Sequence, residues 1–415
     1  MVCYTLHNDF FYSMTYYLLP NTSHLLYKYI DCIQSEETPL PRLSYSLSTY
    51  LYDIKEKLDA RDKDWDVFKR YTNPFEYIHT PVPYKKKSIS KHKPLSRSYF
   101  KMIEMVNMFQ LQFDARPIRT FHLAEGPGGF IEAMSHIRNC KTDSYIGMTI
   151  LDDADPTIPA WKKTEYFLRD HPNVFIETGA DGTGNIICLA NFLHCSQRYA
   201  SSMELITADG GFDFSMDFNN QEIHIAKLLF AQICFALTMQ KAGGSFILKI
   251  FDSFMDHTVD LLYLLSSFYD KVYIIKPNTS RYANSEKYVV CKGFLYSTNT
   301  AYFPYLYKAF EKMCFEPIPP PPGFTVIEKY VHRFLRIPVA YFFVKKIEEY
   351  NAIFGQQQID NIHFTILLID NKHKQDKIDS LIKANVQKCT HWCNKNNVGF
   401  HMMTMEKNNV FMIAK

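Results

Sequence analysis

The sequence predicts an α/β fold in which a mostly parallel sheet is flanked by helices, with an N-terminal helical extension and a small C-terminal α+β domain. Between residues 120 and 294, apolar strand-like runs alternate with helical stretches, which is the pattern of a parallel sheet. Twelve of the fifteen glycines lie between Gly126 and Gly293, so tight turns are concentrated in the same region. The 415 residues, 47% hydrophobic and 21% charged, suffice for two or three folded units and exclude disorder throughout.

Glycines mark where one predicted element of the central region ends and the next begins. A long apolar helix over residues 222–241 ends at Gly243-Gly244, directly before the next strand, as expected where a helix gives way to a strand. The predicted strands are residues 120–124, 145–149, 205–208, 245–249, 272–275 and 288–294.

Four regions are predicted along the chain. Residues 1–80 are rich in Tyr and Leu with helical periodicity, and form the N-terminal helical extension. Residues 81–300 hold the α/β domain, and residues 301–325, which contain a proline run, form a linker. Residues 326–415 form the small α+β domain. Its predicted elements are strands at 340–344 and 363–369 and a helix at 374–394.

Composition excludes several classes of protein. The ten cysteines show no C-x-x-C pair and no disulfide-framework spacing, which predicts reduced thiols and a cytoplasmic location. The longest apolar stretch, residues 228–239, is too short to span a bilayer, and the first residues do not resemble a signal peptide, so we expect no membrane partner. Cys389, His391 and Cys393 are too few and too closely spaced for a structural zinc, so no metal is predicted.

A glycine turn follows the first predicted strand. Residues 120–124 run into Glu125-Gly126-Pro127-Gly128-Gly129-Phe130 and then into a helix at 131–137. Ligands of doubly wound sheets bind at the carboxyl ends of strands, and the first turn of a helix offers free N–H groups. One such turn is as often structural as functional, and its spacing is not that of a dinucleotide binder. A second glycine loop at residues 179–184 favours a nucleoside-containing ligand.

Four polar residues stand at matching positions of the predicted sheet. Taken singly, a lysine at a strand end usually reaches solvent, and an aspartate before Gly-Gly is often a turn former. Two of them follow or end parallel strands, one precedes the last strand, and one lies on a helix at about 97–111, so all four can meet at one rim. They are Lys101, Asp209, Lys249 and Glu286.

Four segments of the central region carry a family resemblance. They read LAEGPGGF at 123–130, TADGGFD at 207–213, LKIFD at 248–252 and KPNTSRYANSEKYVVCKG at 276–293. Through them the chain resembles the FtsJ-like ribose 2′-O-methyltransferases, most closely their mRNA cap branch, over residues 96–295, with a weaker similarity at 73–76. The chain as a whole is similar to FtsJ-like methyltransferases of large cytoplasmic DNA viruses. The resemblance implies a Rossmann-like class I methyltransferase sheet.

The same resemblance implies S-adenosylmethionine as methyl donor and a tetrad formed by Lys101, Asp209, Lys249 and Glu286. Methyl transfer to a hydroxyl needs an in-line approach and removal of a weakly acidic proton. Lys249 would activate the hydroxyl, Lys101 and Glu286 would shape its pKa, and Asp209 would lie beside the methyl group. The implied donor-binding residues are Glu125, Gly126, Pro127, Gly128, Gly129, Phe130, Asp181 and Asp209.

A basic strip leads into the first tetrad lysine. Residues 84–101 contain seven Lys or Arg and no acid, although the whole chain carries a net charge of only +3. Such runs are often solvated loops, but they also neutralise phosphates, and the position next to Lys101 favours contact with RNA. The residues predicted to contact RNA are Lys85, Lys86, Lys87, Arg97, Ser280 and Arg281.

The residues and the resemblance together predict an enzyme that methylates a ribose 2′-hydroxyl near the 5′ end of capped mRNA. Two alternatives stay open: an enzyme acting on an internal ribose of ribosomal or transfer RNA, and a catalytically lapsed RNA-binding or scaffold subunit. The segment at 279–292 favours the cap branch, and the intact tetrad favours an active enzyme. The viral resemblance implies viral capping or transcription proteins as further partners, and the host cytoplasm and the virion as locations.

Overall fold

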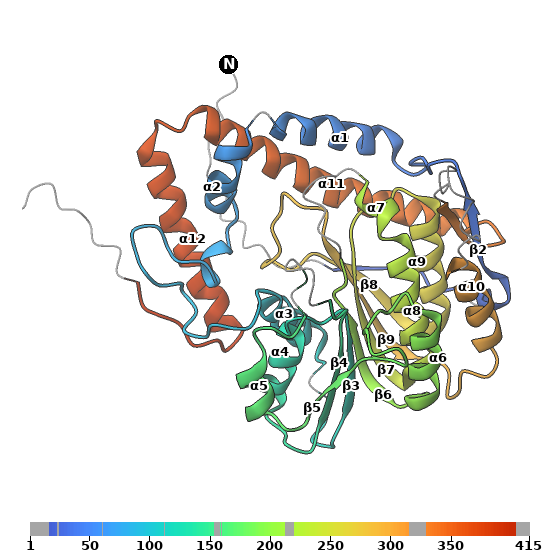
Figure 1. Cartoon of the computed structure of the whole chain (residues 1–415). Coiled ribbons are helices and arrows are strands. Elements are labelled where there is room, and N and C mark those ends of the chain that lie inside the picture. Colours follow the sequence, from blue (N-terminus) through green and yellow to red (C-terminus); the bar gives the residue numbers. More distant parts are fainter. Residues whose placement is uncertain are drawn as a thin grey trace, which may run out of the picture.

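An eight-stranded sheet forms the centre of the molecule (Figure 1). The computed structural model describes residues 16–22, 25–59, 61–111, 113–152, 158, 160–211, 220–314 and 329–403. The strands of this sheet are β1 (Tyr16–Leu18), β3 (Arg119–Leu123), β4 (Ser144–Met148), β5 (Val174–Glu177), β6 (Met203–Ala208), β7 (Gln240–Ile250), β8 (Tyr269–Ile275) and β9 (Lys287–Phe294). Their order is β1-β8-β9-β7-β6-β3-β4-β5. Neighbours from β7 to β5 are parallel, whereas β9 is antiparallel to β7 and β8 and β1 is antiparallel to β8.

The α/β fold class and the six predicted strands are confirmed, the strands as β3, β4, β6, β7, β8 and β9. Sequence analysis missed the two edge strands. β5 has only four residues, and three of them are apolar in succession, so its sequence shows no alternation of apolar and polar residues. In the structure its adjacent Phe175 and Ile176 are both exposed. β1 has only three residues, too few for any pattern.

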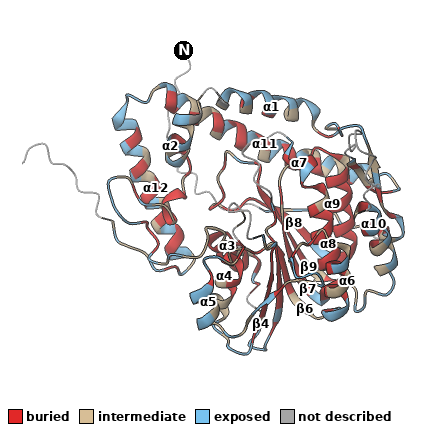
Figure 2. Ribbon diagram, viewed as in Figure 1, coloured by how far each residue is buried: buried red, intermediate tan, exposed pale blue. Residues whose placement is uncertain are grey.

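Helices cover both faces of the sheet (Figure 1). On one side lie α3 (Ser98–Phe109), α4 (Gly129–Arg138) and α5 (Glu165–Asp170), and on the other α6 (Leu189–Arg198), α8 (Ala226–Met239), α9 (Asp256–Phe268) and α10 (Phe303–Cys314). The predicted helix at 222–241 corresponds to α7 (Gln221–His224) and α8. Every residue of α8 except Lys227 is buried, because α8 packs between the sheet and its neighbouring helices (Figure 2). Among the described residues, no helix combines the length and apolarity that crossing a membrane requires.

The N-terminal region contains strands as well as the predicted helices. It comprises η1 (Leu26–Tyr29), β2 (Ile30–Ser35), α1 (Tyr45–Asp59), α2 (Asp62–Thr72) and η2 (Glu76–Ile78), in addition to β1. Strand β2 pairs antiparallel with β10 (Tyr330–Leu335) from the C-terminal region. The N-terminal and C-terminal regions therefore share a small two-stranded sheet, and the N-terminal region is not a separate helical layer.

The C-terminal region differs from its prediction. Both predicted strands, at 340–344 and 363–369, are wrong, because they lie within α11 (Tyr341–Asp370), a 30-residue helix. Its buried residues recur every three or four positions, as at Phe343, Ile347 and Tyr350, but short apolar runs do not distinguish a strand from a buried helix. The predicted helix at 374–394 is confirmed as α12 (Gln375–Lys395).

The predicted linker at 301–325 also differs, because residues 303–314 form α10, whereas the proline run lies outside the described residues. The four domain boundaries stay predictions. The nine cysteines in the described part of the chain are all free thiols.

The sheet brings the ends of several strands to one rim. Strand order reverses between β3 and β6, and the carboxyl ends of parallel strands at such a point form a ligand crevice. Because β9 is antiparallel to β7, its first residues lie beside the last residues of β7, with Lys249 opposite Tyr288. Helix α11 crosses above this rim (Figure 1), and its Asn351 and Gln358 donate hydrogen bonds to the backbone carbonyls of Ser253 and Ala283.

Candidate active site

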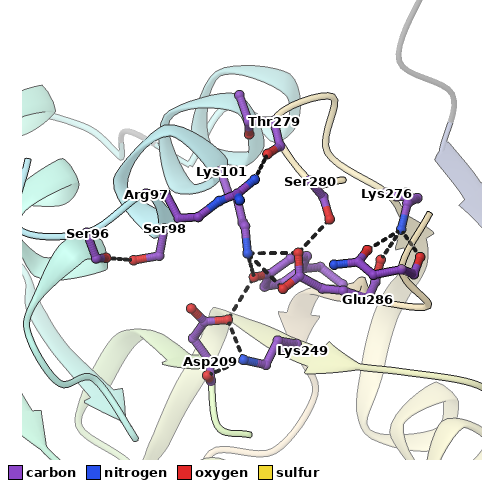
Figure 3. A network of polar contacts seen from close by, with 12 residues as sticks. Ser96, Arg97, Ser98, Lys101, Asp209, Lys249, Lys276, Thr279, Ser280 and Glu286 are labelled. Atoms are coloured by element: carbon purple, nitrogen blue, oxygen red, sulfur yellow. Dashed lines mark hydrogen bonds and ion pairs between the residues drawn. The ribbon is translucent and has the colours of Figure 1, made fainter. Parts of the chain in front are cut away.

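The four predicted polar residues meet in one network at the carboxyl rim of the sheet (Figure 3). The Lys101 Nζ, from α3, lies 2.7 Å from the Glu286 carboxylate just before β9. The Lys249 Nζ, from the end of β7, lies 3.3 Å from Asp209 Oδ1 and donates to the Asp209 backbone carbonyl at 2.7 Å. Each of the four side chains is at most 16% exposed, so the two ion pairs are largely shielded from water.

Tyr288 joins the two ion pairs and was missed by the sequence analysis. Its hydroxyl donates to Asp209 Oδ1 at 2.7 Å and accepts a hydrogen bond from Lys101 Nζ at 3.2 Å. The signal was the spacing, because residues two apart in an extended segment point to the same face, as Glu286 and Tyr288 do. The strand register then sets Tyr288 opposite Lys249.

The network balances its buried charges. Burial lowers the pKa of Lys101, and the charges of Glu286 and Asp209 oppose that shift. Burial alone would raise the pKa of Glu286, but the charges of Lys101 and Lys249 and hydrogen bonds from Lys101 and Ser280 outweigh it and hold that pKa well below its usual range. Two ammonium groups face two carboxylates, so neither sign of charge is buried without compensation.

The segment that carries Glu286, residues 276–286, is here called the Glu286 loop. The Ser280 hydroxyl donates to Glu286 Oε1 at 2.5 Å. Glu104, on α3 three residues after Lys101, accepts from the backbone N–H groups of Asn278 and Thr279 at 3.2 and 3.0 Å, and from the Thr279 hydroxyl at 2.8 Å. Helix α3 therefore supplies a tetrad lysine and also holds the loop that carries the tetrad glutamate.

Three residues predicted to contact RNA have partners within the protein. Ser280 binds Glu286, and Arg97, partly buried, donates to the Thr279 carbonyl at 2.9 Å. Arg281 donates to both carboxylate oxygens of Glu76 in η2, at 2.8 and 3.1 Å. Burial alone would raise the pKa of Glu76, but Arg281 and Arg97 lower it to about 2. These residues lie beside the network and brace it.

The other three, Lys85, Lys86 and Lys87, are exposed. Their strip is anchored to the C-terminal region, because Ser90 forms a β-bridge with Phe400 and two backbone hydrogen bonds flank that bridge. A cavity of about 390 Å³, here called the basic cavity, opens between the two segments. Its lining includes Lys86, Lys87, Lys93, Arg97 and His401, and no aspartate or glutamate among the described residues, whereas Lys85 lies outside it.

The predicted glycine turn follows β3 and starts α4. The Glu125 Oε1 accepts from the backbone N–H groups of Phe130 and Ile131, at 2.8 and 2.9 Å. Gly128 has a φ of 110°, which favours glycine, and a Cβ on Gly129 would lie 2.2 Å from two serine hydroxyls. The Pro127 carbonyl accepts from the Thr164 hydroxyl at 2.8 Å. The turn therefore has a defined shape that side chains at these glycines would disrupt.

Asp181, predicted to face the adenine, lies in an exposed turn after β5. Its Oδ1 accepts from the backbone N–H and hydroxyl of Thr183 at 2.9 and 2.8 Å, and from Asn191 Nδ2 at 2.8 Å. Burial alone would raise the pKa of Asp181, but these hydrogen bonds together outweigh it and lower that pKa to about 2. The structure thus places Asp181 apart from the tetrad, within its own turn.

The residues at the rim fit the methyl donor that the sequence implies. A Cβ on Gly210 would lie 3.2 Å from the Ala124 side chain, so the chain after β6 directly adjoins the start of the glycine turn. A Cβ on Gly211 would lie 3.2 Å from Lys249 Nζ, so the same segment also adjoins the tetrad. Residues 126–129 would hold the methionine part of the donor, and Asp209 would face its positively charged sulfur.

We expect the variant Glu125→Gln to gain stability relative to wild type as pH rises. Burial raises the pKa of Glu125 to about 8, from 4.5. The folded state therefore keeps a proton that the unfolded state releases, and stability falls between about pH 5 and pH 8. A glutamine oxygen still accepts both backbone hydrogen bonds. The free energy of unfolding of the variant minus that of wild type should grow by about 1.4 kcal/mol per pH unit in this window. Urea unfolding at pH 5, 6.5 and 8 measures it, and a constant difference would contradict the prediction.

Comparison with known proteins agrees with this site. Residues 94–294 match the family model of the FtsJ-like methyltransferases. The chain is 29% identical over 357 residues to cap-specific mRNA (nucleoside-2′-O-)-methyltransferase 2 of Pongo abelii, covering 82% of this chain and 44% of that protein. It is 37% identical over 178 residues to cap-specific mRNA (nucleoside-2′-O-)-methyltransferase 1 of Homo sapiens, covering 40% of this chain and 20% of that protein.

The chain spans less than half the length of these two curated relatives. Among solved structures, a putative ribosomal RNA methyltransferase from Plasmodium falciparum aligns with 48% of this chain and 98% of its own, at 20% identity and a TM-score of 0.34. The family match spans the glycine turn and all four tetrad residues. Residues 94–294, just under half of the chain, are therefore similar to the FtsJ-like methyltransferases.

Proposed function

We propose that the protein transfers a methyl group from S-adenosylmethionine to a ribose 2′-hydroxyl near the 5′ end of capped mRNA. The observation that carries the proposal is the network of Lys101, Asp209, Lys249 and Glu286 beside the glycine turn. The cap-specific names of the similar proteins support the choice of capped mRNA as substrate.

The network is suited to the chemistry of this transfer. The donor supplies a methyl group on a positively charged sulfur. Lys249 is the amine held by both the carboxylate and the backbone carbonyl of Asp209. To accept the hydroxyl proton it must first give up its own, and the positive charges of the bound donor and of Lys101 would favour that loss. Those two contacts fix where the amine lies, and Tyr288 ties Asp209 to Lys101. A fixed base favours an in-line approach of the ribose oxygen to the methyl group.

The basic cavity offers a place for phosphates of the RNA. Its lining carries Lys86, Lys87, Lys93 and Arg97, and Arg97 lies one helical turn from Lys101. Positive side chains neutralise phosphates and release counterions, which makes such binding depend on salt. A phosphate bound there would bring the first nucleotides of an RNA toward the tetrad.

Two alternatives differ in what would be methylated. An enzyme acting on an internal ribose would use the same network on another RNA, and a lapsed subunit would bind RNA without transfer. The complete tetrad, with every member in contact with another, favours an active enzyme. The predicted viral partner proteins, the host-cytoplasmic location and packaging in the virion stay predictions.

Transfer of labelled methyl groups from S-adenosylmethionine into matched capped and uncapped RNAs tests the proposal. We expect label only in capped RNA, and nuclease mapping should place it on the first or second transcribed nucleotide. Label on internal riboses would favour the first alternative. Donor binding without transfer into any RNA would favour the lapsed subunit.

Lys249→Met should abolish transfer, because the amine that accepts the proton is gone. We expect a loss of at least about 100-fold in the rate of transfer, with the dissociation constant of the donor unchanged within about twofold. Lys241→Met is the matched control, because Lys241 lies on the same strand and contacts Glu204 at the opposite rim. Transfer by Lys249→Met within a few-fold of wild type would remove Lys249 from the mechanism.

Replacing Lys85, Lys86 and Lys87 with Ala should weaken RNA binding and reduce its salt dependence. The slope of log binding constant against log salt should fall by roughly 0.7 for each phosphate that the variant no longer neutralises. Lys345→Ala with Lys346→Ala is the control, because these neighbouring lysines of α11 pair with Glu348 and Glu349. An unchanged slope in the triple variant would mean that these lysines do not contact RNA and that the strip is an ordinary solvated loop.

A further inference from the structure

Another buried lysine, Lys276, lies next to the tetrad. Lys276, the first residue of the Glu286 loop, is 8% exposed. Its Nζ donates to the backbone carbonyls of Asn284 and Glu286 at 2.6 and 2.8 Å, and to Asn284 Oδ1 at 3.0 Å. In Figure 3, Lys276 reaches the backbone of Glu286 from the side opposite Lys101.

The three contacts match the ammonium form of the side chain. An ammonium has three N–H donors, and here each is directed at an oxygen. A neutral amine has two N–H donors and a lone pair, so one of the three oxygens would face the lone pair. The protonated form is therefore the one that fastens the beginning of the loop to its end.

Lys276 binds the end of the loop that carries the tetrad residue Glu286. Two of the acceptors belong to Asn284, and the third is the backbone carbonyl of Glu286, whose carboxylate binds Lys101. Ser280 and Glu104 hold the middle of the loop. No other side-chain donor in the described residues binds the Glu286 carbonyl, so Lys276 fixes the backbone from which the tetrad glutamate extends.

We propose that protonated Lys276 is a positioning residue for Glu286, and that loss of its proton loosens the Glu286 loop and slows methyl transfer. The activity part rests on the proposed function, whereas the loosening of the loop does not.

Charged groups from several elements face Lys276. They are Lys287 on β9, Glu286 in the same loop, Lys101 on α3 and Asp252 after β7. Burial is the main cause that lowers the pKa of Lys276 to about 7; the two lysines add to the shift and the two carboxylates oppose it. The loop is thus expected to be fastened below about pH 7 and to loosen above it.

The same shift has an opposite effect on stability. The folded pKa lies below the unfolded value of 10.5, so between these values the unfolded state binds the proton and the folded state does not. Stability therefore rises with pH in this window, and keeping the ammonium buried at lower pH costs stability.

Lys276→Met tests the proposal, because methionine keeps much of the side-chain volume and removes all three donors. At pH 6 we expect transfer to fall about 100-fold, as for a misplaced reacting group, with a melting temperature equal to or above that of wild type. The ratio of wild-type to variant activity should shrink toward pH 9, where wild type has also lost the proton. Lys292→Met is the control, since Lys292 lies on β9 and donates only to the Phe109 carbonyl among the described residues.

Hydrogen exchange of the wild-type protein gives a second readout without substitution or RNA. The protection factors of the amides of residues 278–286, corrected for the intrinsic effect of pH, should fall as pH rises through 7. Unchanged protection would overturn the proposal, and so would activity of the Lys276→Met variant within threefold of wild type at pH 6. A ratio of wild-type to variant activity that does not change with pH, together with a lowered melting temperature of the variant, would also overturn it. A wild-type protein that methylates no RNA but shows the fall in protection would refute the proposed function and support the role of Lys276 in the loop.

Discussion

The active rim depends on one strand running against its neighbours. Strand β9 is antiparallel to both β7 and β8, so its beginning meets the end of β7. This direction brings a carboxylate that precedes β9 to the same edge as groups that end β6 and β7. It also pairs Lys249 with Tyr288 across two strands, and through Tyr288 the two ion pairs become a single network. In a sheet of parallel strands only, Glu286 would stand at the opposite edge.

Parts of the chain outside the family match hold that rim in place. Glu76 of η2 binds Arg281, and Gln358 of α11 binds the Ala283 carbonyl. The regions before and after the family match therefore both contact the Glu286 loop. Arg97, a predicted RNA ligand, donates to the Thr279 carbonyl of the same loop and also lines the basic cavity. The terminal regions are therefore part of the support of the site. A buried ionic network needs such support, because its charges contribute favourably only while their geometry is maintained.

The sequence was sufficient where local signals were strong. Glycines and turn residues separated the six inner strands, and strand ends pointed to the tetrad residues. It was insufficient where a partner lies far along the chain. Glu76 and Arg281 are 205 positions apart, so nothing near Arg281 indicated that its charge is used within the protein. The two-residue spacing suggests that Tyr288 lies on the same face as Glu286, but only the register of β9 sets it opposite Lys249. The strands predicted in the C-terminal region failed because short apolar runs suit a buried helix equally well.

The pairing of β2 with β10 has a consequence for how the protein is made. Its partners, residues 30–35 and 330–335, are separated by almost the whole described chain. At the usual rates of synthesis, β2 emerges from the ribosome about 15 to 60 seconds before β10 exists. During that interval its backbone hydrogen-bonding groups have no strand to pair with, and an unpaired edge invites association with other chains. Strand β1 faces the same delay, because its partner β8 ends only at Ile275. The N-terminal strands β1 and β2 are thus made well before the strands that pair with them, and they lack those partners during most of synthesis.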